Sequence, residues 1–148
     1  MPVHFSVVRR CKNSTFLILH MKEVITQSES DRIALEAFLK GKTPLTLELF
    51  HQLALAFMEA GAAGLRPAKT MISIATDRKR VAYITQLGKN FVHLIIPFTQ
   101  AYEDNLCFQK IARVPGTDQY NHHFRMYAPE DLNAEIRAYI KKAVDAGQ

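Results

Sequence analysis

Hydrophobic and polar residues alternate with a period of two through the middle of the chain, whereas hydrophobic residues recur at helical spacing on both sides of it. The alternating part, from Met71 to Tyr127, predicts four or five short strands in succession. The connections are too short to hold crossover helices, so we expect the strands to pair antiparallel as a meander. The expected strands are 69–75, Val81–Leu87, Phe91–Phe98, Phe108–Val114 and Tyr120–Tyr127, with the almost continuously apolar Phe91–Phe98 placed centrally.

Two helices are expected before the strands. Ser28 can cap the first, from Glu29 to Lys40, with a side-chain oxygen that accepts a free backbone N–H. The second starts at Thr43 and Pro44, because a capping hydroxyl followed by a residue of fixed φ is a typical helix start. Its apolar stripe ends at Gly61.

A third helix is expected after the strands. Pro129 opens it, Glu130 and Asp131 lie at its positive end, and Lys141 and Lys142 lie at its negative end. The pattern therefore predicts an α+β fold, in which an antiparallel meander sheet of four to five strands is packed on one face by two to three helices. The other face of the sheet should be left open.

The composition suits one domain. A chain of 148 residues, of which 48% are hydrophobic, can bury about two-thirds of its unfolded surface. Residues 1–27 give mixed signals and are interpreted as an N-terminal extension of uncertain structure, followed by a single α+β domain over residues 28–148. No apolar run of the sequence is long enough for a membrane span, so we expect a cytoplasmic protein.

Metal and cofactor chemistry finds little support in the sequence. Cys11 and Cys107 are far apart and form no Cys-x-x-Cys pair, so we expect neither a disulfide framework nor a zinc site. The sequence has no nucleophile elbow, phosphate-binding glycine loop or His-Glu-x-x-His motif. We therefore expect no metal and no cofactor, and leave open whether the protein is an enzyme.

The histidine pair His122-His123 illustrates how strand parity assigns side chains to faces. Neighbours on a strand point to opposite faces, so these two rings cannot hold one metal ion. His122 follows the apolar parity and should be a hydrogen-bonded histidine in the core or at its rim. His123 follows the polar parity, together with Arg125 and Tyr127, and should face outward.

The same parity places Lys69 and His93 on the open sheet face, which is the candidate site, where we expect a small anionic ligand or a protein partner to bind. With His123, Arg125 and Tyr127 they would offer cationic and hydrogen-bonding groups to an anionic ligand, because an arginine can fork two bonds to a carboxylate or phosphate. Polar alternation is also what any one-sided antiparallel sheet requires. A solvated face or a dimer contact therefore remains the competing interpretation.

Three further functions are kept as alternatives. An enzyme would use His123 as acid or base and Lys69 or Arg125 to stabilise negative charge. A homodimer could form through Met71 or through residues 3–19. A nucleic-acid module would bind phosphates through Arg78, Lys79, Arg80, Lys110 and Arg113. Nucleic acid is disfavoured despite the net charge of +5, because nucleic-acid binding proteins usually carry denser Lys and Arg clusters along one face or helix.

Three segments resemble a small bacterial domain of unknown function, the DUF family numbered fifty-six fifty-five. They are Ala68-Lys69-Thr70-Met71-Ile72-Ser73, Lys89-Asn90-Phe91-Val92, and His122-His123-Phe124-Arg125-Met126 with the following Pro129-Glu130-Asp131-Leu132. The likeness covers about Thr43 to Ala146. It implies a compact α+β fold and no activity, and by matching positions it adds Thr70 to the candidate residues. The full candidate set is Lys69, Thr70, His93, His123, Arg125 and Tyr127.

Overall fold

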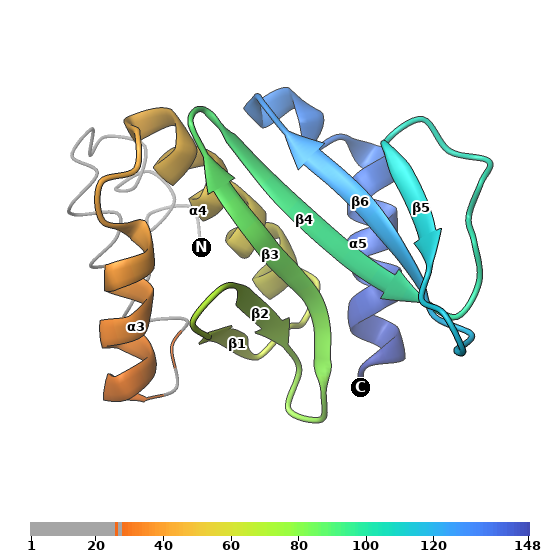
Figure 1. Cartoon of the computed structure of the whole chain (residues 1–148), viewed down its shortest axis with the longest axis horizontal. Coiled ribbons are helices and arrows are strands. Elements are labelled where there is room, and N and C mark those ends of the chain that lie inside the picture. The colour runs from red at the N-terminus through yellow and green to blue at the C-terminus, as the bar shows by residue number, and fades with distance from the viewer. Residues whose placement is uncertain (1–25, 27) are drawn as a thin grey trace.

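The computed structural model describes Thr26 and residues 28–148, so the extension expected over residues 1–27 lies outside the described residues apart from Thr26. Two helices precede a six-stranded sheet, and a short 3-10 turn and a helix follow it (Figure 1). The elements are α3 (Glu29–Leu39), α4 (Pro44–Glu59), β1 (Gly64–Pro67), β2 (Ile72–Ala75), β3 (Arg80–Gly88), β4 (Phe91–Phe98), β5 (Lys110–Arg113), β6 (Tyr120–Met126), η1 (Pro129–Asp131) and α5 (Ala134–Ala146).

All neighbouring strands of the sheet pair antiparallel, in the order β1-β2-β3-β4-β6-β5. The α+β fold is confirmed, with one strand more than expected. The order is sequential except at its end, where β6 lies between β4 and β5. The long connection over residues 99–109 allows this step, because it can carry the chain past one strand position to the edge.

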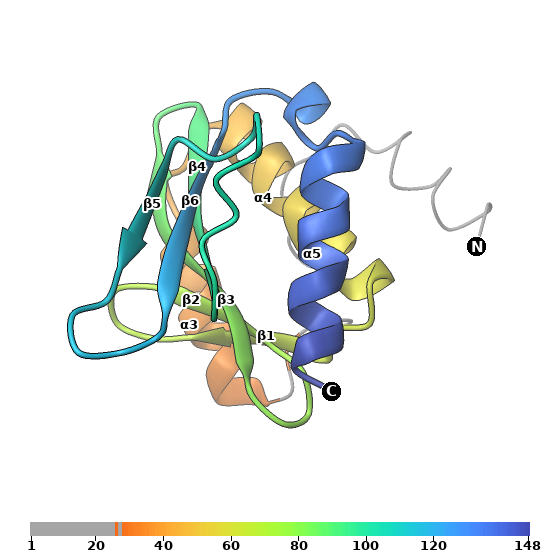
Figure 2. The ribbon, with the colours of Figure 1, turned by 90° about the vertical axis from the view of Figure 1, so that its right-hand side faces the viewer.

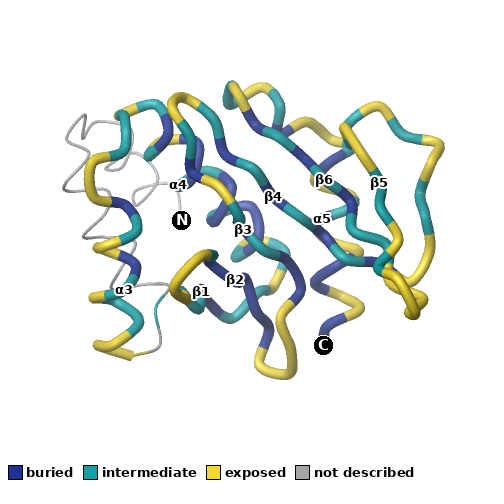
Figure 3. Tube along the Cα trace, viewed as in Figure 1, coloured by how far each residue is buried: buried dark blue, intermediate teal, exposed yellow. Residues whose placement is uncertain are grey.

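Helices α4 and α5 pack side by side on one face of the sheet, and α3 lies beside the edge strand β1 (Figures 1 and 2). Their apolar stripes and the inward side chains of the sheet form the core, and each such side chain contributes roughly 1.5–3 kcal/mol. The fully buried members include Leu49, Leu53 and Phe57 of α4, Ile136 and Val144 of α5, and Ile72, Ile74, Ile84, Leu94, Ile96 and Met126 of the sheet. Buried and half-buried residues alternate along β4 and β6, as one covered face requires (Figure 3).

Hydrogen bonds confirm the first two helix starts and correct the third. Ser28 Oγ accepts the N–H of Asp31 at 3.0 Å, as predicted. Pro129 does not open α5, because it begins the separate turn η1. The Asp131 carboxylate accepts the backbone N–H groups of residues 127 and 128, at 2.8 and 3.0 Å, and so closes this turn. The helix itself is capped by Asn133, whose Oδ1 accepts the N–H of Ile136 at 3.1 Å.

The edge strand β1 was not predicted. It has only four residues, Gly64–Pro67, and begins with glycine and ends with proline, both of which are depleted in strands. Tertiary structure forms it nonetheless, because Leu65 is fully buried and pairs with Ile74 of β2.

The buried Thr46 connects α4 to the β3–β4 hairpin. Its hydroxyl donates to the carbonyl of Gly88 at 2.7 Å and accepts the N–H of Asn90 at 2.9 Å. Asn90 has a φ of +65°, so the turn uses the left-handed region that asparagine tolerates better than most residues. These hydrogen bonds hold the β3–β4 hairpin, and with it the outward side chains of β4, against α4.

Candidate functional site

One row of cross-strand partners runs over the open face through all six strands. The pairing register links successive residues of this row, so their side chains share the face that α4 and α5 leave uncovered. At about 4.8 Å per strand, the row spans roughly 24 Å from edge to edge. Its members are Arg66, Ser73, Tyr83, Ile95, His123 and Lys110.

The strands carry positive charge only. The six strands contain five Lys and Arg residues and no Asp or Glu: Arg66, Arg80, Lys110, Arg113 and Arg125. Arg113 pairs with Asp118 at 4.0 Å. The other four form no ion pair with any residue that the structure describes, so their charge is not compensated on the sheet.

Arg125 and two histidines form a hydrogen-bonded chain on this face. Arg125 Nε–H donates to Nδ1 of His93 at 3.2 Å, and Nε2 of His93 lies 2.9 Å from Nδ1 of His123. An arginine Nε can only donate, so Nδ1 of His93 accepts and the proton of the neutral ring is on Nε2. That N–H then donates to Nδ1 of His123. The proton of His123 is therefore on Nε2, and this N–H is a donor that the Arg125–His93–His123 hydrogen bonds do not use.

Aromatic rings hold Arg125 in place. Its guanidinium carbon lies 4.6 Å from the centroid of the Phe91 ring, which is a cation–π contact. Phe91 in turn lies against Tyr127, with ring centroids 6.0 Å apart. Between the Phe91 ring and His93 the guanidinium has little rotational freedom, so its remaining N–H groups are oriented before any ligand arrives.

Both outward histidines have lowered pKa values. Burial, then the charge of Arg125 and the neighbouring His123, lower the pKa of His93. Burial, followed by Lys110 and His122, lowers the pKa of His123. Both rings are therefore neutral at pH 7, as the hydrogen-bonded chain requires, and the positive charge of the cluster resides on Arg125 and Lys110.

His122 has the structural role that its parity predicted. It is fully buried, accepts the N–H of Tyr102 on Nε2 at 3.1 Å and donates from Nδ1 to the carbonyl of Tyr120 at 2.9 Å. The rings of Phe98 and Phe108 lie 5.0 Å from it, and burial lowers its pKa. It faces the helices, away from His123.

The structure brings together four of the six candidate residues and separates two. His93, His123, Arg125 and Tyr127 lie on β4, on β6 or directly after β6, and contact one another directly or through Phe91. Lys69 and Thr70 do not belong to a strand, because β2 begins at Ile72.

A tight turn accounts for this correction. The N–H of Ala68 donates to the carbonyl of Met71 at 2.7 Å, which leaves Lys69 and Thr70 exposed at the tip of the β1–β2 hairpin. Strands β3 and β4 separate that hairpin from β6. Lys69 lies instead along a groove with Ala34 of α3.

Sequence reasoning did not assign Lys110 to this site. It pairs with His123 across β5 and β6, which places its side chain on the open face beside that histidine, whose pKa its charge helps to lower. The sequence predicts that these two strands are neighbours, but it does not specify the register that sets Lys110 opposite His123.

No family model, curated protein or solved structure matches this chain. Among the residues that the structure describes, no group of three or more His, Cys, Asp or Glu side chains is arranged to hold a metal ion. Within the same residues, no helix has the length and apolar character needed to span a membrane.

Proposed function

We propose that the protein binds a small anion, a carboxylate or phosphate group, on the open sheet face at Arg125, His93, His123 and Lys110. The observation that carries the proposal is the Arg125–His93–His123 chain of hydrogen bonds, which fixes the proton of His123 on Nε2, with Lys110 as the cross-strand partner of that histidine. Charge-assisted hydrogen bonds from such groups are stronger than neutral ones, and arginine can supply two of them in parallel.

The hydrogen-bond pattern favours binding over acid–base catalysis. A general base needs a free lone pair directed at its substrate. In the Arg125–His93–His123 chain of hydrogen bonds, the Nδ1 atoms of both histidines already accept a hydrogen bond, and each Nε2 atom carries a proton. His123 therefore presents a donor, which suits an anionic oxygen and does not suit proton abstraction.

A titration with matched variants tests the proposal. Isothermal calorimetry with inorganic phosphate and with succinate should give saturable binding, and Arg125→Gln should weaken it about tenfold or more, which is about 1.4 kcal/mol. Arg137→Gln is the control, because it makes the same chemical change on α5, where Arg137 pairs with Glu59 at 3.8 Å. Equal weakening by both variants would reduce the effect to net charge, and no saturable binding would exclude the site.

A second pair of variants tests the ring N–H. His123→Gln should weaken anion binding, because it replaces an oriented donor with a flexible amide and removes the partner of His93. His51→Gln, on α4, is its control. Amide spectra of each variant verify that the sheet still forms. Anion binding that is unchanged in His123→Gln would contradict the assigned role of this histidine.

A further inference from the structure

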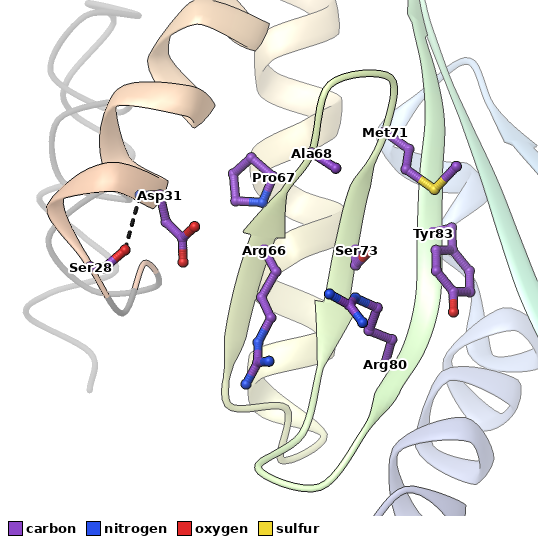
Figure 4. A pocket seen from close by; sticks show the side chains of 9 residues that line it. All are labelled: Ser28, Asp31, Arg66, Pro67, Ala68, Met71, Ser73, Arg80 and Tyr83. Carbon is purple, nitrogen blue, oxygen red and sulfur yellow. Dashed lines mark hydrogen bonds between the residues drawn. The ribbon is translucent and has the colours of Figure 1, made fainter.

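A cavity of about 780 Å³ lies at the other end of the same sheet, between α3 and strands β1 to β3. It involves none of the residues of the proposed site above. Its volume lies within the range of sites that hold whole small molecules, and it is much larger than a single phosphate requires. The polar residues that line it are Ser28, Asp31, Arg66, Ser73, Arg80 and Tyr83 (Figure 4).

Two arginines from different strands reach this cavity. Arg66 on β1 and Arg80 on β3 flank β2, and the side chain of Arg80 extends over β2 toward the strand that carries Arg66 (Figure 4). Neither guanidinium forms an ion pair or hydrogen bond with any residue in the described part of the chain. Two uncompensated guanidinium groups beside one cavity are the usual means of binding a phosphate, since each can donate two parallel bonds.

Ser73 provides an independent observation. Its side chain lies on the open face between the two arginines, and the residue is only 3% exposed. Its hydroxyl lines the cavity and makes no hydrogen bond to any described residue. Although the residue as a whole is buried, its oxygen is not closed off from the cavity, so a water molecule or a ligand there can reach it. The hydroxyl is therefore placed to donate to an anionic oxygen bound by the arginines.

The side of the cavity formed by α3 has the opposite chemistry. Asp31, in the first turn of α3, directs its carboxylate toward β1, and Ser28 lies next to it (Figure 4). A carboxylate repels an anion but accepts hydrogen bonds from hydroxyl groups. The Tyr83 hydroxyl can donate or accept on the β3 side. The cavity thus combines an anion-binding end with a hydroxyl-binding end.

We propose that this cavity is a second binding site, for a phosphate monoester of a polyhydroxylated molecule such as a sugar phosphate. Arg66, Arg80 and Ser73 bind the phosphate, and Asp31 accepts hydrogen bonds from the hydroxyl groups. The proposal is independent of the anion site at Arg125, because the two sites share no residue and lie at different ends of the sheet.

Calorimetric titration of the full chain with ribose 5-phosphate tests the proposal, with inorganic phosphate and ribose as the component probes. Ribose 5-phosphate should bind saturably and more tightly than inorganic phosphate. Arg66→Gln or Arg80→Gln should each weaken it about tenfold or more. Because a phosphate group can also bind at the Arg125 site, the titrations are repeated in Arg125→Gln, where the affinity of ribose 5-phosphate for this cavity should be unchanged.

Asp31→Asn separates hydroxyl recognition from charge. It should weaken ribose 5-phosphate binding while strengthening inorganic phosphate binding at this cavity, because the substitution removes both an acceptor and a negative charge. Thermal unfolding of every variant verifies that it folds. The proposal is overturned if ribose 5-phosphate fails to saturate up to about 10 mM. It is equally overturned if Arg125→Gln abolishes binding that Arg66→Gln retains, or if inorganic phosphate binds the Arg125→Gln variant as tightly as ribose 5-phosphate does.

Discussion

Replacing Thr46 by valine removes one buried hydroxyl and keeps the shape of the side chain. Thr46 is 0% exposed, and its hydroxyl hydrogen-bonds two backbone groups of the β3–β4 turn. In Thr46→Val, the carbonyl of Gly88 and the N–H of Asn90 both lose their partner. The hydrogen bond from the Thr43 hydroxyl to Oδ1 of Asn90, at 2.8 Å, would remain, but it satisfies neither of these backbone groups.

The size of the effect follows from the burial of these two groups. An unsatisfied buried donor or acceptor costs about 1–3 kcal/mol. Gly88 is half-buried and Asn90 is exposed, so water can compensate part of the loss. We expect the free energy of unfolding to fall by about 2–3 kcal/mol, which corresponds to a melting temperature lower by roughly 4–12 °C in a chain of this size.

Urea unfolding with Thr46→Ser as the control measures this prediction. The serine variant keeps the hydroxyl and loses one methyl group, at a cost of about 1 kcal/mol. The valine variant should therefore be the less stable of the two, with an unchanged dependence of the free energy on urea concentration. A valine variant as stable as the wild type, or more stable than the serine variant, would refute the role assigned to the hydroxyl.

Three further predictions concern the rest of the fold. Folding lowers the pKa of all three sheet histidines, His93, His122 and His123, so below about pH 6.5 the unfolded chain binds more protons than the folded one. The free energy of unfolding, measured by urea unfolding at each pH, should therefore decrease as the pH falls from about 6.5 toward the folded pKa values. Asn133→Ala should lower the free energy of unfolding by about 1 kcal/mol through loss of the α5 cap, whereas Asn133→Asp should not. Burial and the Glu135 carboxylate raise the pKa of Cys107 to about 12, so in a Cys11→Ser background iodoacetamide should alkylate the folded protein about a thousandfold more slowly at pH 8 than the urea-unfolded protein. Equal rates in the two states would contradict this environment.

The sequence predicted those elements whose signals are local. The alternation and turn around Phe91–Phe98 gave that strand its observed bounds, and Ser28 and Thr43 marked their helices because a cap depends on a few adjacent residues. Pro129 misled for the same reason: it is a valid first residue, but of a 3-10 turn, and the change at Leu132 to a non-helical ψ of 65° ends that turn before α5 begins. Local signals identify a start and do not fix how far the element extends.

The candidate site was predictable only as far as one strand at a time allowed. Parity placed His93 and His123 on one face, but their hydrogen bond depends on the register between β4 and β6, which the sequence does not specify. Lys110 joins them through the edge position of β5. The cavity beside Arg66 depends on the unpredicted strand β1 and on the position of α3 next to it. Contacts between elements distant in sequence were therefore the part that patterns could not supply.

Long-range proton–nitrogen spectra of the imidazole rings test the central claim, the oriented Arg125–His93–His123 chain. At pH 7.5 both outward rings should be neutral, with the proton on Nε2, and His122 should be neutral with the proton on Nδ1. Added phosphate should shift the Nε2 resonance of His123 and leave that of His122 unchanged. A proton on Nδ1 of His123, or a phosphate response confined to other residues, would contradict the account.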